Sequence, residues 1–306
     1  PDWTTPDRLA YTIRLFRILT DLLPNGMEGG VSTPPLSYRL WWKTDQEKQQ
    51  ATARATAHIL LLLEELIQIE KETGKFLHLD IEPEPDGIFD STRDFVTWYE
   101  DTLLPEGTAY LQDKLNISSE AARALILKHI QLCYDICHAA VGYEQPAEIL
   151  ASLAQAGIQV GRIQISSALK VDFTTESELK YSAIQTFNEP IYLHQVVARN
   201  ADGTHTHYAD LPQALANWNA NQEEWRVHFH VPLFTKSYGL LDSTQSDIVN
   251  TLAIHARKPF SPFLEVETYT WGVLPEDMQK PMDESIVREL EWVQLILNQT
   301  NTSTLF

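Results

Sequence analysis

Short apolar runs of strand length alternate along this chain with longer segments of helical periodicity. A helix is predicted over residues 45–73, because Gly74 follows at the position where helices usually end. The run 76–82 comes next, and we expect five strand–helix units, with strands near residues 30, 79, 134, 163 and 266. Strands and helices that alternate at this spacing are typical of a parallel sheet with helical crossovers. The chain is therefore predicted to have an α/β fold.

Five parallel strands are compatible with two architectures. They can form an open doubly wound sheet, or they can be the last five strands of an eight-stranded (β/α)8 barrel whose first three strands precede Pro1. Residues 175–225 interrupt the alternation, and Asn-Ala-Asp-Gly at 200–203 is a hairpin signal between two β-like runs. We expect a single domain over 1–306, with a helix and a hairpin inserted at 175–225.

Charge, hydropathy and cysteine content exclude several classes of protein. The 23 Lys and Arg against 42 Asp and Glu leave a net charge of −19, which disfavours a nucleic-acid partner. No run of eighteen apolar residues is present, so insertion into a membrane is not expected. Two cysteines are too few for a disulfide framework and indicate a cytoplasmic protein. Cys133 and Cys137 lie four apart without a second pair, so we interpret them as buried apolar residues.

Polar side chains lie where the predicted strands end, which is where parallel sheets bind their ligands. In the run 76–82, the alternation of a strand places Asp80 and Glu82 on one face, and Glu267 repeats this pattern in the last strand. Asp135 ends the third strand, and His138 follows three residues later. A carboxylate inside a sheet is costly unless a metal, a cation or hydrogen bonds satisfy it. These side chains are therefore candidates for a metal site.

Two histidines and one amide extend this candidate site. His228 and His230 lie on the same face of an extended segment, a pattern that some metal and substrate sites use. Gln164 is a poor metal ligand, so we expect it to donate a hydrogen bond to a substrate hydroxyl or to a neighbouring residue. We interpret three histidines near the predicted hairpin as surface residues: His194, His205 and His207. Four aromatic residues suit either an apolar ligand or ordinary core packing: Trp41, Trp42, Tyr143 and Trp271.

Residues 135–138, Asp-Ile-Cys-His, look like the Asp-X-X-His motif of the xylose isomerase-like TIM-barrel superfamily. More of the chain resembles the EboE metabolite-traffic proteins, in these segments: 78–85, 133–141, 164–169, 228–234 and 264–271. The resemblance implies a bacterial, cytoplasmic (β/α)8 barrel whose first three βα units precede Pro1. It also implies a small-molecule metabolite as ligand, and association with other proteins of an operon linked to export of a secondary-metabolite precursor.

The resemblance also implies roles for individual residues. Carried over position by position, the metal ligands would be Glu82, Asp135, Glu267 and His230. We expect the substrate to contact His138, Gln164, His228 and Trp271. The superfamily usually has a metal-binding histidine in the seventh strand, where this chain has Gln164. Carboxylates without that imidazole favour Mg²⁺ or Mn²⁺ over Zn²⁺.

Three functions are compatible with these residues. The first is an isomerase or epimerase, in which Glu82 and Glu267 transfer protons at a carbon next to a carbonyl of a small polyol or keto compound. The second is a carrier that binds a metabolite without converting it. The third, an abasic-site endonuclease, is disfavoured by the acidic charge and by the few histidines at the predicted strand ends.

Overall fold

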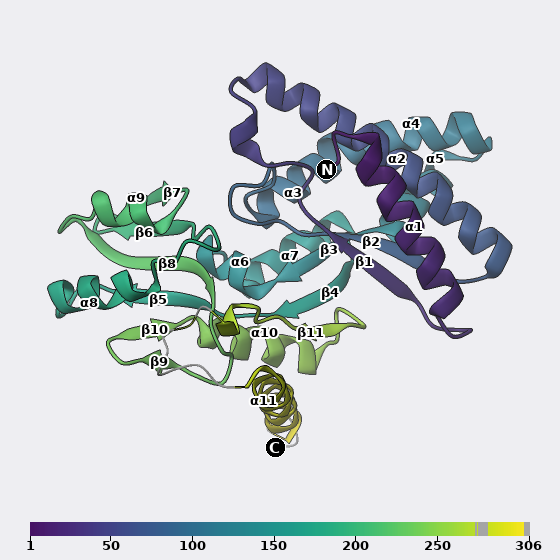
Figure 1. The fold of residues 1–306 in the computed structure, drawn as a ribbon. Coiled ribbons are helices and arrows are strands. Elements are labelled where there is room, and N and C mark those ends of the chain that lie inside the picture. Colours follow the sequence, from purple (N-terminus) through teal and green to yellow (C-terminus); the bar gives the residue numbers. More distant parts are fainter. Residues whose placement is uncertain (273, 275–280, 303–306) are drawn as a thin grey trace. The chain divides into compact units, whose positions relative to one another are not determined.

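The computed structural model describes residues 1–272, 274 and 281–302, which form two compact units (Figure 1). The first unit comprises Pro1–Tyr134, Ile149–Ile163 and Ser261–Phe263. The second comprises Asp135–Glu148, Gln164–Phe260 and the chain from Leu264 onward. The boundary runs through two strands, so Asp135 and Gln164 at their carboxyl ends belong to the second unit.

Helices make up much of the first unit. These are α1 (Pro6–Leu22), η1 (Arg39–Trp41), α2 (Asp45–Thr73), α3 (Thr92–Trp98), η2 (Tyr99–Leu103), α4 (Leu104–Leu115), α5 (Ser119–His129) and most of α7 (Pro146–Ala156). Helix α2 has the predicted bounds because both of its ends are capped. The Thr44 hydroxyl accepts from the Glu47 amide at 3.2 Å, and the Glu47 carboxylate accepts from the Thr44 amide at 3.0 Å. Gly74 ends the helix with a φ of 71°.

The five predicted strands are present and form one sheet in the order β1-β2-β3-β4-β11. Their bounds are β1 (Gly29–Thr33), β2 (Leu77–Ile81), β3 (Ile130–Asp135), β4 (Val160–Ile165) and β11 (Leu264–Val266). Strand β2 pairs in parallel with β1 and with β3. Beside β11, the Glu267 amide donates to the Ile165 carbonyl at 3.0 Å. The predicted α/β fold with a parallel sheet is thus confirmed, and the closed eight-stranded barrel remains a prediction.

A buried ion pair satisfies the carboxylate that the alternation turns into the sheet of the first unit. Asp80 is fully buried, and its carboxylate contacts His78 Nδ1 at 2.5 Å and Arg162 Nε at 3.1 Å. Arg162 also donates to the Gly30 carbonyl at 2.7 Å. Asp80 therefore has its charge partner within the protein, and its burial needs no metal.

The second unit contains a separate six-stranded sheet in the order β7-β6-β8-β5-β10-β9. The strands are β5 (Ala168–Asp172), β6 (Val196–Asn200), β7 (His205–Tyr208), β8 (Gln222–His230), β9 (Ser237–Tyr238) and β10 (Leu241–Ser243). The helices are α6 (Ile136–Val141), α8 (Ser177–Ile184), η3 (Gln185–Phe187), α9 (Leu211–Ala216), α10 (Gln245–Arg257), η4 (Thr270–Gly272) and α11 (Met282–Thr302). The predicted hairpin is β6–β7. The sheet also uses residues on both sides of the expected 175–225 insertion.

Strand β8 lies between β5 and β6 and is antiparallel to both. Trp225, Val227 and Phe229 are fully buried in the core of the second unit. Because successive strand side chains point to opposite faces, His228 and His230 project from the other face of β8. The same alternation that builds this core therefore sets the direction of both imidazoles.

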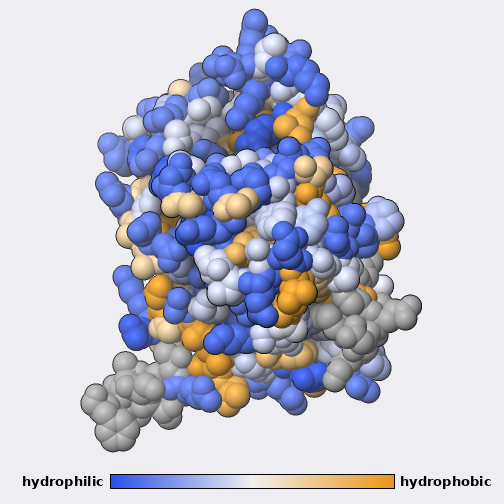
Figure 2. Space-filling view, turned by 90° about the vertical axis from the view of Figure 1, so that its left-hand side faces the viewer, coloured by the Kyte–Doolittle hydropathy of each residue, from blue (hydrophilic) through white to orange (hydrophobic). Residues whose placement is uncertain are grey.

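The surface in Figure 2 is mostly hydrophilic, and hydrophobic residues interrupt it in several small patches. Among the helices of the described residues, none combines the length and the apolar character needed to cross a membrane.

Candidate metal centre

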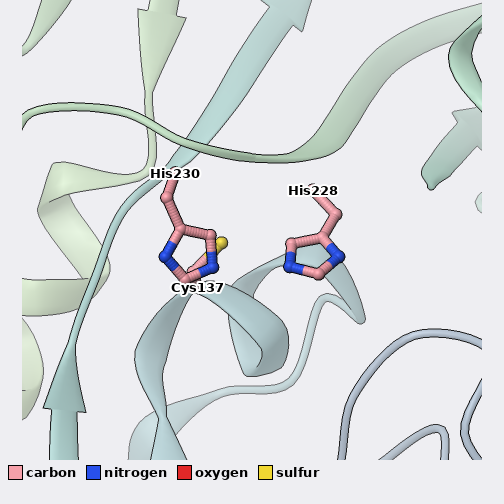
Figure 3. A group of neighbouring side chains, drawn as sticks. All are labelled: Cys137, His228 and His230. Atoms are coloured by element: carbon pink, nitrogen blue, oxygen red, sulfur yellow. The ribbon is translucent and has the colours of Figure 1, made fainter. Parts of the chain in front are cut away.

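Strand β8 and helix α6 bring two imidazoles and a thiol together in the second unit (Figure 3). His228 and His230 extend from β8 toward the helix that carries Cys137. One nitrogen of each ring and the Cys137 sulfur lie within 4.8 Å of one another. All three residues are buried, so the cluster is shielded from bulk water.

The hydrogen bonds of the two rings determine which nitrogen keeps a lone pair. His230 Nδ1 donates to the backbone carbonyl of Glu267 at 2.9 Å, which leaves the lone pair on Nε2. This Nε2 is buried and has no hydrogen-bond partner among the described residues. His228 Nδ1 donates to Gln195 Oε1 at 2.8 Å, and its Nε2 lies 3.0 Å from His138 Nε2. Metal-binding histidines are commonly oriented in this way, through the nitrogen that does not bind the ion.

Asp135 is held at the amino end of α6 by a short network. Its Oδ1 accepts from the His138 amide at 2.7 Å and from the Ser166 hydroxyl at 2.9 Å. The Ser166 oxygen in turn accepts from the Cys137 amide at 2.8 Å. Asp135 Oδ2 is buried without a hydrogen-bond partner in the described part of the chain. The carboxylate is therefore oriented through one oxygen and can bind a ligand through the other.

Asp135 connects further candidate ligands within the second unit. One oxygen of Asp135 and one nitrogen each of His138 and His230 lie within 4.8 Å of one another. A carboxylate oxygen of Glu267 is also within 4.8 Å of one of Asp135. Ligand atoms that each lie about 2.0–2.3 Å from one Zn²⁺ must lie within about twice that distance of one another, which these atoms nearly do. Cys137, His228 and His230 form a second grouping that shares His230 with the first.

Burial and hydrogen bonding set the charge of the candidate ligands. Burial lowers the pKa of His230 to about 4 and the pKa of His228 well below its usual range. Burial acts to raise the pKa of Asp135, but the imidazoles of His138 and His230 and two hydrogen bonds outweigh it, and the pKa is lowered. At neutral pH His228 and His230 therefore offer neutral imidazoles and Asp135 an ionised carboxylate, which are the forms that bind a cation.

Three further predicted site residues are described by their own surroundings. Glu82 belongs to the first unit, where its carboxylate lies 3.7 Å from Cys133 Sγ. Gln164 is buried near the end of β4, two residues before Ser166. Trp271 lines an apolar pocket whose described lining residues include none of the candidate ligands. The roles predicted for these three residues remain predictions.

The structure corrects one interpretation and adds three residues. His194 was expected at the surface, but it is buried, with Nδ1 3.2 Å from the His228 carbonyl and Nε2 2.8 Å from Glu189 Oε1. His205 and His207 are exposed as expected. Sequence reasoning missed the contributions of Cys137, Ser166 and Gln195 to the site. Cys137 lies inside the Asp-Ile-Cys-His motif, and this position could have indicated that its thiol lies near the site.

Comparison with known proteins adds no family to this geometry. Models of protein families, curated proteins and solved structures were all compared with the chain, and none matched it.

Proposed function

We propose that the second unit binds a divalent metal ion through Asp135, His138 and His230, and that the protein performs isomerase- or epimerase-type chemistry on a small polyol or keto compound. One observation carries the metal proposal. Asp135 Oδ2 and His230 Nε2 are both buried and have no hydrogen-bond partner among the described residues. Unpaired buried acceptors cost about 1–3 kcal/mol each, and a cation held by both atoms would offset that cost.

The ligands favour a particular class of metal. A set of carboxylates alone would favour Mg²⁺ or Mn²⁺, as expected from the strand-end residues. Strand β8 adds the imidazole of His230, and α6 adds that of His138. Two imidazoles with one carboxylate favour Zn²⁺ or another transition metal, such as Mn²⁺, over Mg²⁺.

The surrounding side chains suit proton transfer next to a carbonyl group. A bound divalent ion would polarise the substrate carbonyl and stabilise the enediolate charge. The Glu267 carboxylate, within 4.8 Å of Asp135, would hold the proton removed from the adjacent carbon. The role of Glu82 as a second acid–base group stays a prediction. His138 Nε2 lies 3.0 Å from His228 Nε2, so the two imidazoles hold each other in place, and we propose that His228 orients a substrate oxygen.

As the framework for this chemistry we propose a (β/α)8 barrel of the xylose isomerase type. The support is a parallel sheet in which the five strands have the same order as in the chain, with helices between them in the sequence. We also propose a cytoplasmic location, because the chain has only two cysteines, too few for a disulfide framework, and both are buried.

Metal analysis by mass spectrometry tests the proposal. We expect about one transition-metal ion per chain in the wild type, and its loss in Asp135→Asn and His230→Ala. Asp202→Asn and His205→Ala are matched controls, because both residues are exposed in or beside the β6–β7 turn. Retention of the ion by His230→Ala would contradict the site. A bound ion without conversion of any keto sugar or polyol would contradict the chemistry and leave the metal site standing.

A further inference from the structure

We infer that the second unit has another binding site, separate from the metal centre, for a small aromatic carboxylate. The site is a pocket of about 660 Å³ between residues of η3, η4, α11 and the segment that contains β9 and β10. This volume lies within the range of about 300–1,000 Å³ that is usual for small-molecule sites. None of the candidate metal ligands of the second unit is among its described lining residues.

The wall of the pocket is largely aromatic and continuous with the core of the second unit. Phe187, Leu241 and Trp271 line the pocket and are buried members of that core. Tyr238 also lines it, and its hydroxyl donates to the Pro232 carbonyl at 2.9 Å, which holds the ring in place. An ordered wall of flat rings and aliphatic side chains fits a flat apolar ligand.

Two lining residues have hydrogen-bond donors that the described residues do not satisfy. Trp271 Nε1 can only donate, and Ser285 carries a hydroxyl; both atoms are buried and lack partners within 1–272, 274 and 281–302. Ser285 is 0% exposed and Trp271 is 6% exposed. Unsatisfied buried donors are unfavourable, so an acceptor oxygen of the ligand toward which either side chain turns would relieve that cost.

One cation determines the charge of the ligand. Arg288 is the single charged residue among the described lining residues, and it lies three positions after Ser285 on α11. Its guanidinium lies over the Phe234 ring, 4.0 Å from the ring centre, and no ion pair holds it among the described residues. A single guanidinium pairs well with one carboxylate, whereas a doubly charged phosphate favours several cations. The apolar wall, the two donors and this cation together select an aromatic monocarboxylate.

Calorimetry with 2-naphthoate tests this site in the whole chain. We expect one molecule to bind per chain, with an affinity that EDTA does not change, because the pocket is separate from the metal centre. Arg288→Met should weaken binding at least tenfold. Arg257→Met is the matched control, because Arg257 is exposed on α10 outside the pocket, and it should bind as the wild type does. Neutral 2-naphthalenemethanol should bind at least tenfold more weakly than 2-naphthoate.

A second variant blocks the pocket without removing its charge. Ala183 on α8 lines the pocket, and Ala183→Phe should abolish binding of 2-naphthoate while circular dichroism and the melting temperature show a folded chain. Equal binding by the wild type, Arg288→Met and Ala183→Phe would overturn the site, and so would binding that EDTA abolishes. No binding at millimolar 2-naphthoate would overturn it as well. None of these outcomes depends on the metal content of Asp135→Asn, so this site and the proposed metal centre fail independently.

Discussion

His230 Nδ1 donates a hydrogen bond to the backbone carbonyl of Glu267 at 2.9 Å. This bond connects the end of β8 to the residue that follows β11. It orients the imidazole and leaves the Nε2 lone pair beside Asp135, His138 and Cys137. A backbone carbonyl is present whatever the side chain of residue 267, so the orientation of His230 should survive substitution of Glu267.

Metal binding should weaken at acid pH. The pKa of His230 is lowered to about 4, so its Nε2 stays free of a proton until the pH falls to that value. Below it, protonation competes with the ion, and the apparent affinity should fall about tenfold per pH unit for this ligand alone. Competition with a chromophoric chelator between pH 7 and pH 3.5 measures the effect, while circular dichroism monitors folding. If the metal affinity of the folded protein stays constant down to pH 3.5, His230 is excluded as a ligand.

Ser166→Ala should destabilise the second unit by about 1–3 kcal/mol. The substitution removes the hydroxyl that donates to Asp135 Oδ1 and accepts from the Cys137 amide, and it leaves both partners buried. Urea unfolding measures the loss. Ser182→Ala is the control, because the exposed Ser182 hydroxyl donates only to the Glu178 carbonyl of its own helix, and it should change stability by less than about 0.5 kcal/mol.

Gly161→Ala should destabilise the first unit by about 2–3 kcal/mol or more. An added Cβ at this position would lie 1.9 Å from Asp80 Oδ1, and Asp80 cannot move freely because His78 and Arg162 hold its carboxylate. Gly272→Ala is the matched control, since no atom of the described residues, apart from its chain neighbours, lies within 4 Å of its Cβ position. Thermal and urea unfolding compare the two variants. Equal stability of the two variants would show that the side chains around Asp80 move aside for the added methyl group.

The stability of the wild type should fall between pH 4.5 and pH 7 because of Glu289. Burial raises the pKa of this carboxyl to about 7, and an unfolded chain releases the proton near 4.5. Over that interval the folded chain binds more protons, so its stability decreases as the pH rises. The contribution is fully present below pH 4.5 and is lost above about 7, with a size on the order of 3 kcal/mol.

Glu289→Gln removes this titration and keeps an oxygen for the Leu233 amide and the Thr268 hydroxyl. The wild type should therefore lose stability relative to Glu289→Gln as the pH rises, measured as the difference between their free energies of unfolding. Urea unfolding at pH 4.5, 6 and 8 provides the comparison. Glu291→Gln, at an exposed position on the same helix, should follow the wild type at all three values.

Much of the first unit was predictable because its signals are local. The cap at Thr44, the stop at Gly74 and the apolar runs of the parallel strands each act within a few residues. The convergence of Asp135 and Glu267 also followed from sequence reasoning, because carboxyl ends of parallel strands share one edge. Cys137 is buried in the core, as expected. Its spacing from Cys133 contained no information about strand β8, so its closeness to His228 and His230 was not foreseen.

The amino-acid sequence by itself determined most of the helices, the parallel strands and the polar residues at their ends, because capping, periodicity and alternation depend on near neighbours. The order of the strands in the sheet came from the structure. Only the tertiary structure decided that His228 and His230 meet Cys137 and His138, and that Arg162 neutralises Asp80. Those contacts join residues some 80 to 90 positions apart in the chain. Antiparallel pairing and side-chain packing create them, and neither has a local signature in the sequence.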